Sequence, residues 1–81
     1  MHERAFPELL GQRVRSRRED LGLSQVELAE LAGCSTRFVH TVEAGKATLR
    51  LATLLQVLRA LGLRLELAGP GTQIRKSPPA R

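Results

Sequence analysis

The segment SQVELAELAGCSTRFVHTVEAGK, residues 24–46, constrains the fold most, because it predicts two very short helices separated by a turn of three or four residues that contains Gly33. Ser24 and Glu27 have the spacing of a capping box, which predicts that the first of these helices begins here. Gly33 ends that helix, and Ser35 is placed to cap a second helix that stops near EAGK. Two short helices joined by a turn that contains glycine form a helix-turn-helix arrangement.

Two longer helices are expected on either side of this pair. Pro7 suits the first residue of a helix that continues through residues 8–21. Leucine dominates residues 48–63, which predicts a central helix capped by Thr48. The apolar positions expected to face the core are Leu10, Val14, Leu21, Leu28, Leu31, Ala32, Leu51, Leu54, Leu55, Leu58 and Leu61.

The segment LRLEL, residues 63–67, changes the apolar period from helical to two, which predicts a β-strand. A lone strand leaves its backbone groups unpaired, so we expect it to pair with the same strand of a second copy. Antiparallel pairing centred near Leu65 sets Arg64 of one copy opposite Glu66 of the other. The alternative is an extended segment packed on its own helices, with dimers formed by the leucine-rich helix. The expected dimerisation residues are Leu63, Arg64, Leu65, Glu66 and Leu67.

The charge balance favours a polyanionic partner. Thirteen Lys and Arg residues exceed eight Asp and Glu residues, which gives a net charge of +5 in 81 residues. A basic domain of this size points to nucleic acid ahead of a membrane surface, although a basic surface without a function stays open. Two Phe and no Trp or Tyr argue against stacking on single-stranded bases.

Enzyme chemistry has little support in the sequence. There is no nucleophile–base pair and no phosphate-binding loop, so no catalytic residue or cofactor is expected. Cys34, His2 and His40 lack the spacing of zinc ligands, so no metal is expected, and a single cysteine excludes an intrachain disulfide. Without a signal peptide or a membrane-spanning apolar run, we expect a cytoplasmic, nucleoid-associated protein with no membrane partner.

Over about residues 8–62 the chain resembles the phage-repressor-like (XRE/Cro-type) helix-turn-helix regulators of bacteria. The matching motifs are Leu23-Ser24-Gln25, Glu27-Leu28-Ala29, Gly33, Ser35, Val39, Val42-Glu43 and Gly45-Lys46. The continuation TLLQVLRALGLRLEL, residues 53–67, is similar to a narrower subgroup, the HipB-like antitoxins, in which a strand follows the fourth helix. The resemblance implies a mainly α, four- to five-helix repressor-like domain with one short C-terminal strand that pairs between subunits.

The expected organisation follows from these elements. Residues 1–5 form a flexible N-terminus, and residues 6–67 form the DNA-binding domain with its dimerisation strand. Residues 68–81 carry glycine, prolines and basic residues without periodicity, and are expected to be a flexible basic tail.

The resemblance also implies a DNA-reading surface, because the third helix of the family lies in the major groove. Arg37 is expected to pair with guanine O6 and N7, and Lys46 to contact phosphate. His40 could instead be a solvated surface residue without a DNA contact, and Thr36 could serve only to start the helix. Many relatives carry glutamine or lysine at the positions matching 35–37, so the DNA sequences that they bind do not predict the operator of this chain. The implied DNA-binding residues are Gln25, Ser35, Thr36, Arg37, His40, Thr41 and Lys46.

Arg18 is a charge in an apolar position. It follows Val14 by four residues on the inward stripe of the first helix, where an unpaired charge is costly. The resemblance pairs it with Glu43 at the end of the third helix, which predicts an inward salt bridge.

The leading functional hypothesis is a homodimeric, sequence-specific repressor that acts on double-stranded, near-palindromic operator DNA. The subgroup resemblance adds the role of an antitoxin in a toxin-antitoxin operon, which represses its own operon and binds a HipA-like kinase toxin. The alternatives are a stand-alone regulator without a toxin, and a protein-interaction adaptor that has lost DNA binding.

Overall fold

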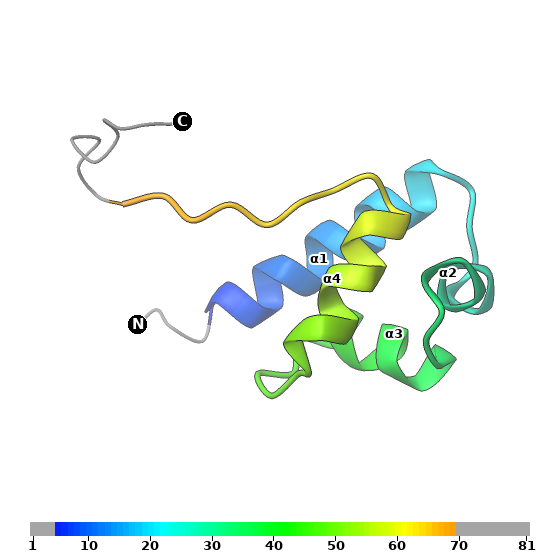
Figure 1. Cartoon of the computed structure of the whole chain (residues 1–81), viewed down its shortest axis with the longest axis horizontal. Helices are drawn as coiled ribbons and strands as arrows, with labels where there is room; N and C mark the ends of the chain where they lie inside the picture. Colours follow the sequence, from blue (N-terminus) through cyan, green and yellow to red (C-terminus); the bar gives the residue numbers. More distant parts are fainter. Residues whose placement is uncertain (1–4, 70–81) are drawn as a thin grey trace.

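The computed structural model describes residues 5–69 as four helices connected by short turns (Figure 1). The helices are α1 (Ala5–Asp20), α2 (Gln25–Ala32), α3 (Thr36–Glu43) and α4 (Leu51–Ala60). This arrangement confirms the mainly α fold. Most of the predicted N-terminal segment and of the basic tail lies outside the described residues.

Helix α1 begins at Ala5, two residues before the predicted start at Pro7. The proline still lies in the first turn, where backbone N–H groups have no partner within the helix, so its missing N–H removes no helical hydrogen bond. Further along α1, Gly11 lies against the end of α3: a Cβ atom there would be 2.5 Å from the carbonyl oxygen of Val42 and 2.9 Å from that of Glu43. Only a residue without a side chain permits so close an approach of the two backbones.

The predicted limits of α2 and α3 are confirmed. The Ser24 hydroxyl accepts from the backbone N–H of Glu27 at 3.0 Å, and the Glu27 carboxylate accepts from the Ser24 N–H at 2.8 Å. Gly33 ends α2 with φ of 76°, a left-handed conformation that glycine adopts without strain. The Ser35 hydroxyl then caps α3 by accepting from the backbone N–H of Phe38 at 3.0 Å.

The core lies where α2 packs against α3 and α4, and where α1 packs against α3. Burial of these aliphatic side chains is the main stabilising contribution to a domain of this size. The buried residues are Val14, Leu28, Ala29, Ala32, Val39, Val42, Leu54, Val57, Leu58 and Leu61.

Four leucines predicted to be buried are exposed. Leu21 follows the last residue of α1 and Leu51 is the first residue of α4, and a side chain at a helix end has neighbours on fewer sides. Leu55 lies at the edge of the stripe that α4 buries, and Leu31 faces away from the core on α2. The predicted Thr48 cap is also wrong, because the residue before α4 is Arg50, which makes no side-chain capping bond.

After α4 the chain continues in an extended conformation along residues 63–69 (Figure 1). Leu63 is half-buried and its N–H donates to the carbonyl of Leu58 at 2.8 Å, whereas Leu67 is 96% exposed. No strand occurs within residues 5–69, because a strand requires a paired neighbour and none of these residues provides one. Pairing of residues 63–67 between two copies stays a prediction.

Candidate nucleic-acid interface

Helix α3 has one buried face and one exposed polar face. Val39 and Val42 are almost completely buried in the core. The opposite side carries the side chains that the sequence predicted for DNA reading: Ser35, Thr36, Arg37 and His40 are exposed, and Thr41 is half-buried. The fold therefore gathers five of the seven predicted DNA-binding residues on the solvent side of one short helix and its cap.

The polar groups on this face differ in how much hydrogen-bonding capacity they retain. The Thr41 hydroxyl donates to the carbonyl of Arg37 at 2.8 Å, which leaves its lone pairs and methyl group for a ligand. The Ser35 oxygen accepts the capping bond, which leaves the hydroxyl hydrogen for a ligand. Arg37 takes part in none of the side-chain hydrogen bonds found among residues 5–69, so the five N–H donors of its guanidinium face solvent.

Lys46 lies just beyond the end of α3. Gly45 has φ of 82°, and the N–H of Lys46 donates to the carbonyl of Thr41 at 3.3 Å. These two features turn the chain and close the last turn of the helix. The exposed Lys46 side chain is thereby held close to the helix that carries Arg37.

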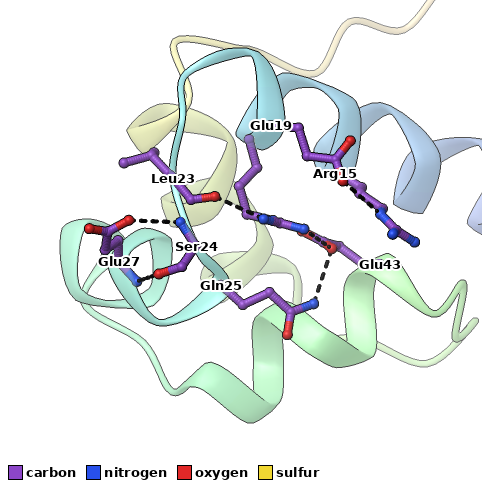
Figure 2. A network of polar contacts seen from close by, with 8 residues as sticks. Arg15, Glu19, Leu23, Ser24, Gln25, Glu27 and Glu43 are labelled. Atoms are coloured by element: carbon purple, nitrogen blue, oxygen red, sulfur yellow. Dashed lines mark hydrogen bonds and ion pairs between the residues drawn. The ribbon is translucent and has the colours of Figure 1, made fainter.

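A network of hydrogen bonds beneath this surface joins three helices (Figure 2). Arg18 on α1 forms the predicted ion pair with Glu43 through two parallel bonds, Nε to Oε2 at 2.7 Å and Nη2 to Oε1 at 3.0 Å. Arg18 Nη1 also donates to the carbonyl of Leu23 at 2.8 Å. Gln25, the first residue of α2, donates from Nε2 to Glu43 Oε1 at 3.1 Å. Glu43 thus connects the end of α3 to α1 and to the start of α2.

Both members of the ion pair are charged at neutral pH. The hydrogen bond to Glu43 raises the pKa of Arg18. Burial acts to raise the pKa of Glu43, but the hydrogen bonds from Arg18 and Gln25, together with the positive charges of Arg18 and Arg15, outweigh it and lower that pKa. The side chains are only 12% and 5% exposed, so the pair is shielded from solvent. A two-pronged arginine–carboxylate contact fixes orientation as well as distance, and so holds α3 relative to α1.

Gln25 was predicted only as a DNA contact, and the structure gives it a second role. One of its amide hydrogens is directed to Glu43, while the side chain remains half-buried at the start of α2. Its amide also has another hydrogen and an acceptor oxygen. The internal bond fixes the side chain's position, and its contact with DNA stays a prediction.

Two structural side chains were missed by the sequence analysis. Arg17 donates to the carbonyl of Leu61 at 2.9 Å, where it satisfies a terminal carbonyl after α4 and lies at the negative end of that helix. Gln56 donates to the carbonyl of Ala32 at 3.2 Å and connects α4 to the end of α2. Nothing in the local sequence distinguishes Arg17 from its neighbouring arginines, because its partner is 44 residues away.

Metal-binding and thiol chemistry has little support within residues 5–69. No group of three potential metal ligands occurs among these residues. Cys34 is half-buried, and burial raises the pKa of its thiol, which disfavours the reactive thiolate. Within the same residues, no helix has the length and apolar character needed to cross a membrane.

Comparison with known proteins agrees with this arrangement. Residues 9–68 match a family model described as a helix-turn-helix domain. The chain is also similar to a protein of Sinorhizobium fredii named as an uncharacterized HTH-type transcriptional regulator, y4mF. The two are 42% identical over 65 residues, which cover 80% of this chain and 86% of the relative. Neither comparison separates the HipB-like subgroup from the wider group, so that assignment stays a prediction.

Proposed function

The chain belongs to the helix-turn-helix domain family, and from this premise we propose that it is a sequence-specific transcriptional repressor that binds operator DNA as a homodimer. DNA-binding transcriptional regulation is the coarse function that the family and the S. fredii relative support. Repression, the homodimer and the operator's symmetry are the finer parts of the proposal.

The observation that carries the proposal is the exposed polar face of α3. Arg37 lies in the first turn of α3 and makes no side-chain hydrogen bond within residues 5–69, and the ion pair between Arg18 and Glu43 holds the helix from its inner side. A recognition helix reads bases with the residues near its N-terminus, and a guanidinium pairs with guanine O6 and N7 through two bonds. Arg37 is therefore assigned to base reading.

The other side chains have assigned roles around that contact. Thr36 and Thr41 present methyl groups and hydroxyl oxygens to neighbouring bases, and His40 lies on the same face. Lys46 is assigned to a phosphate, which positions the domain without carrying sequence information. Gln25 is assigned to a bridge between a phosphate and a base, as the family resemblance implies. Ser35 contributes through the cap that fixes the start of the helix.

The homodimer is proposed to form through residues 63–67. This segment is extended, and apart from the Leu63 N–H, which donates to Leu58, its backbone takes part in none of the hydrogen bonds found among residues 5–69. Residues 64–67 can therefore pair with a second copy. A two-fold dimer places two recognition helices on successive turns of DNA, so its operator should be a near-palindrome with half-sites about one helical turn apart, roughly 34–36 Å. A monomer would select only one half-site.

The antitoxin role is a further part of the proposal. Its basis is the leucine-rich continuation into residues 63–67, which resembles HipB-like antitoxins. In this role the dimer represses the operon that encodes it and binds a HipA-like kinase encoded beside it. Purification from the native cell, with identification of the proteins that accompany it, distinguishes this role: a co-purifying kinase-like protein selects the antitoxin, and its absence selects the stand-alone regulator.

A duplex titration at two salt concentrations separates the regulator from an adaptor without DNA binding. We expect the affinity to fall steeply as salt rises, because cationic side chains displace counterions from phosphates. Lys46→Ala should weaken binding to all sequences about equally and reduce the salt dependence by about one counterion. Arg59→Ala, which removes an equal charge from the last turn of α4, is the control. Affinity that is unmeasurable at both salt concentrations would favour the adaptor.

A further inference from the structure

An apolar groove of about 600 Å³ lies between α1 and the extended segment that follows α4. Leu58, which is buried, and Leu10, which is half-buried, line its inner side, whereas Phe6 and Leu9 are each 59% exposed. A groove of this volume is in the size range of sites for small organic ligands, which combine an apolar lining with a few polar groups that fix orientation. The groove is therefore large enough for a ligand that would cover the exposed apolar side chains.

The lining of the groove changes from apolar to polar along α1. In chain order the lining residues of this helix are Phe6, Leu9 and Leu10, followed by Gln12, Arg13 and Ser16. The extended segment runs back along the molecule from the end of α4 (Figure 1), and it begins beside the later part of α1, since a Cβ atom on Gly62 would be 3.4 Å from Arg17 Nη2. Arg64, two residues further on, is the lining residue of this segment that adds a second positive charge to the polar end.

The two lining arginines are able to bind an anion. Arg13 takes part in none of the side-chain hydrogen bonds found among residues 5–69. Arg64 pairs with Glu66 at 2.7 Å, but these side chains are 83% and 65% exposed, and so open an ion pair contributes little and exchanges readily. Within residues 5–69, no acidic residue lines the groove. A guanidinium binds a carboxylate through two parallel hydrogen bonds, so the polar end of the groove is complementary to a carboxylate.

The groove is on the side of α1 that faces away from α3. Gly11 contacts the end of α3, and Leu9 and Arg13, two residues before and after it, lie about 160° from it around the helix. A ligand in the groove is therefore remote from the exposed face of α3. Pairing of two copies along the backbone edge of residues 64–67 would also leave the side chains of Leu63 and Leu65 in the groove, because side chains stand perpendicular to the plane of a sheet.

We propose that this groove binds a medium-chain fatty acid, with the carboxylate at Arg13 and Arg64 and the alkyl chain over Leu9 and Phe6. From residue 13 to residue 6, α1 rises by about 10 Å, which is long enough for an extended alkyl chain of this class. A small anion would leave the apolar end of the groove exposed, and an uncharged hydrocarbon would leave both guanidinium groups without a ligand. The inference does not depend on the proposed DNA binding.

Calorimetric titration of the full chain with sodium decanoate, below the concentration at which decanoate forms micelles and without DNA, tests the site. We expect saturable binding of one decanoate per chain. Arg13→Gln should raise the dissociation constant by about three- to tenfold, because it removes a charge-assisted contact, and Leu9→Ser by a similar factor, because it removes apolar contact. The controls are Arg59→Gln, which removes an equal charge from α4, and Leu31→Ser, which changes an exposed leucine on α2. Both controls should bind decanoate as the wild type does.

A second ligand and a second measurement separate the possible outcomes. Decyltrimethylammonium has the same alkyl chain with a cationic head, and it should bind about tenfold more weakly or not at all. Equal affinity for the two amphiphiles, or absence of saturation by decanoate at millimolar concentration, would overturn the proposal. In NMR spectra, decanoate should shift the signals of Phe6 and Leu9. Signals that ignore decanoate and change only with protein concentration would mean that a second copy covers the groove, and would equally refute the fatty-acid site.

Discussion

Replacement of Arg18 by alanine tests whether the buried ion pair holds the domain together. The Glu43 side chain is 5% exposed in the wild type, and the substitution leaves it with Gln25 as its remaining side-chain partner among residues 5–69. The substitution also removes the donor to the carbonyl of Leu23. Removal of one partner from a buried pair typically costs about 3–5 kcal/mol, because the other charge stays behind. A domain of this size has a total stability at the low end of about 5–15 kcal/mol, so Arg18→Ala should lose much of it.

Urea and thermal denaturation followed by circular dichroism at 222 nm measure this loss. For a small domain each kcal/mol shifts the melting temperature by about 4–8 °C, so a decrease of about 12 °C or more is expected. Arg15→Ala is the matched control, since it breaks the exposed pair of Arg15 and Glu19 on the same helix, whose side chains are 64% and 55% exposed. That change should cost about 1 kcal/mol or less.

A second variant keeps the reasoning testable if Arg18→Ala does not fold. Arg18→Met combined with Glu43→Leu removes both charges and retains apolar volume, so it should recover a large part of the lost stability. Equal losses for Arg18→Ala and Arg15→Ala would refute the argument, and would mean that Arg18 contributes no more than a surface arginine.

Three further predictions concern acid, packing and the end of the chain. Folding lowers the pKa of Glu43, so the ionised carboxylate stabilises the folded state fully above the unfolded pKa, and this stabilisation is lost as the pH falls through the folded pKa. The free energy of unfolding, measured at a series of pH values below about pH 4.3, should show this loss. In Glu43→Gln the part of the pH dependence that comes from Glu43 should be absent. Gly11→Ala should lower the free energy of unfolding, measured in urea, by about 1–3 kcal/mol, because the added Cβ meets the Val42 carbonyl. This loss is expected even though alanine has the better helix propensity. Ser16→Ala, on the exposed surface of the same helix, is the control and should not destabilise the domain. Truncation after Gly62 should give a folded monomer with weaker operator binding, and a truncated chain that stays dimeric at micromolar concentration would contradict strand pairing.

The sequence predicts helix limits well where they depend on nearby residues. Ser24, Glu27, Gly33 and Ser35 cap or end their helices through bonds that span a few residues, and all four act as expected. The Arg18 pairing was predicted only through the family resemblance, because periodicity alone places the charge inward without naming its partner.

Contacts between distant residues were the part that local reasoning missed. A helical stripe shows which side is apolar, but not where a neighbouring helix stops covering it, and so Leu31 and Leu51 were wrongly placed in the core. The bond from Arg17 to the Leu61 carbonyl and the approach of Gly11 to Val42 depend on how α1 packs on the rest of the domain. For the proposed DNA-reading face of α3, the sequence indicated the residues, and the structure added the hydrogen bonds that hold the helix from its inner side.

The most direct test of the central claim, that the exposed face of α3 reads DNA, is a binding selection from random duplexes with the wild-type chain, Arg37→Ala and the control Arg59→Ala. The wild type and the control should select the same near-palindromic sequence. Arg37→Ala should bind that sequence about 1–3 kcal/mol more weakly and lose its preference at one base pair in each half-site. An unchanged base preference in Arg37→Ala would contradict the assignment of α3 as the recognition helix with Arg37 as its reading residue.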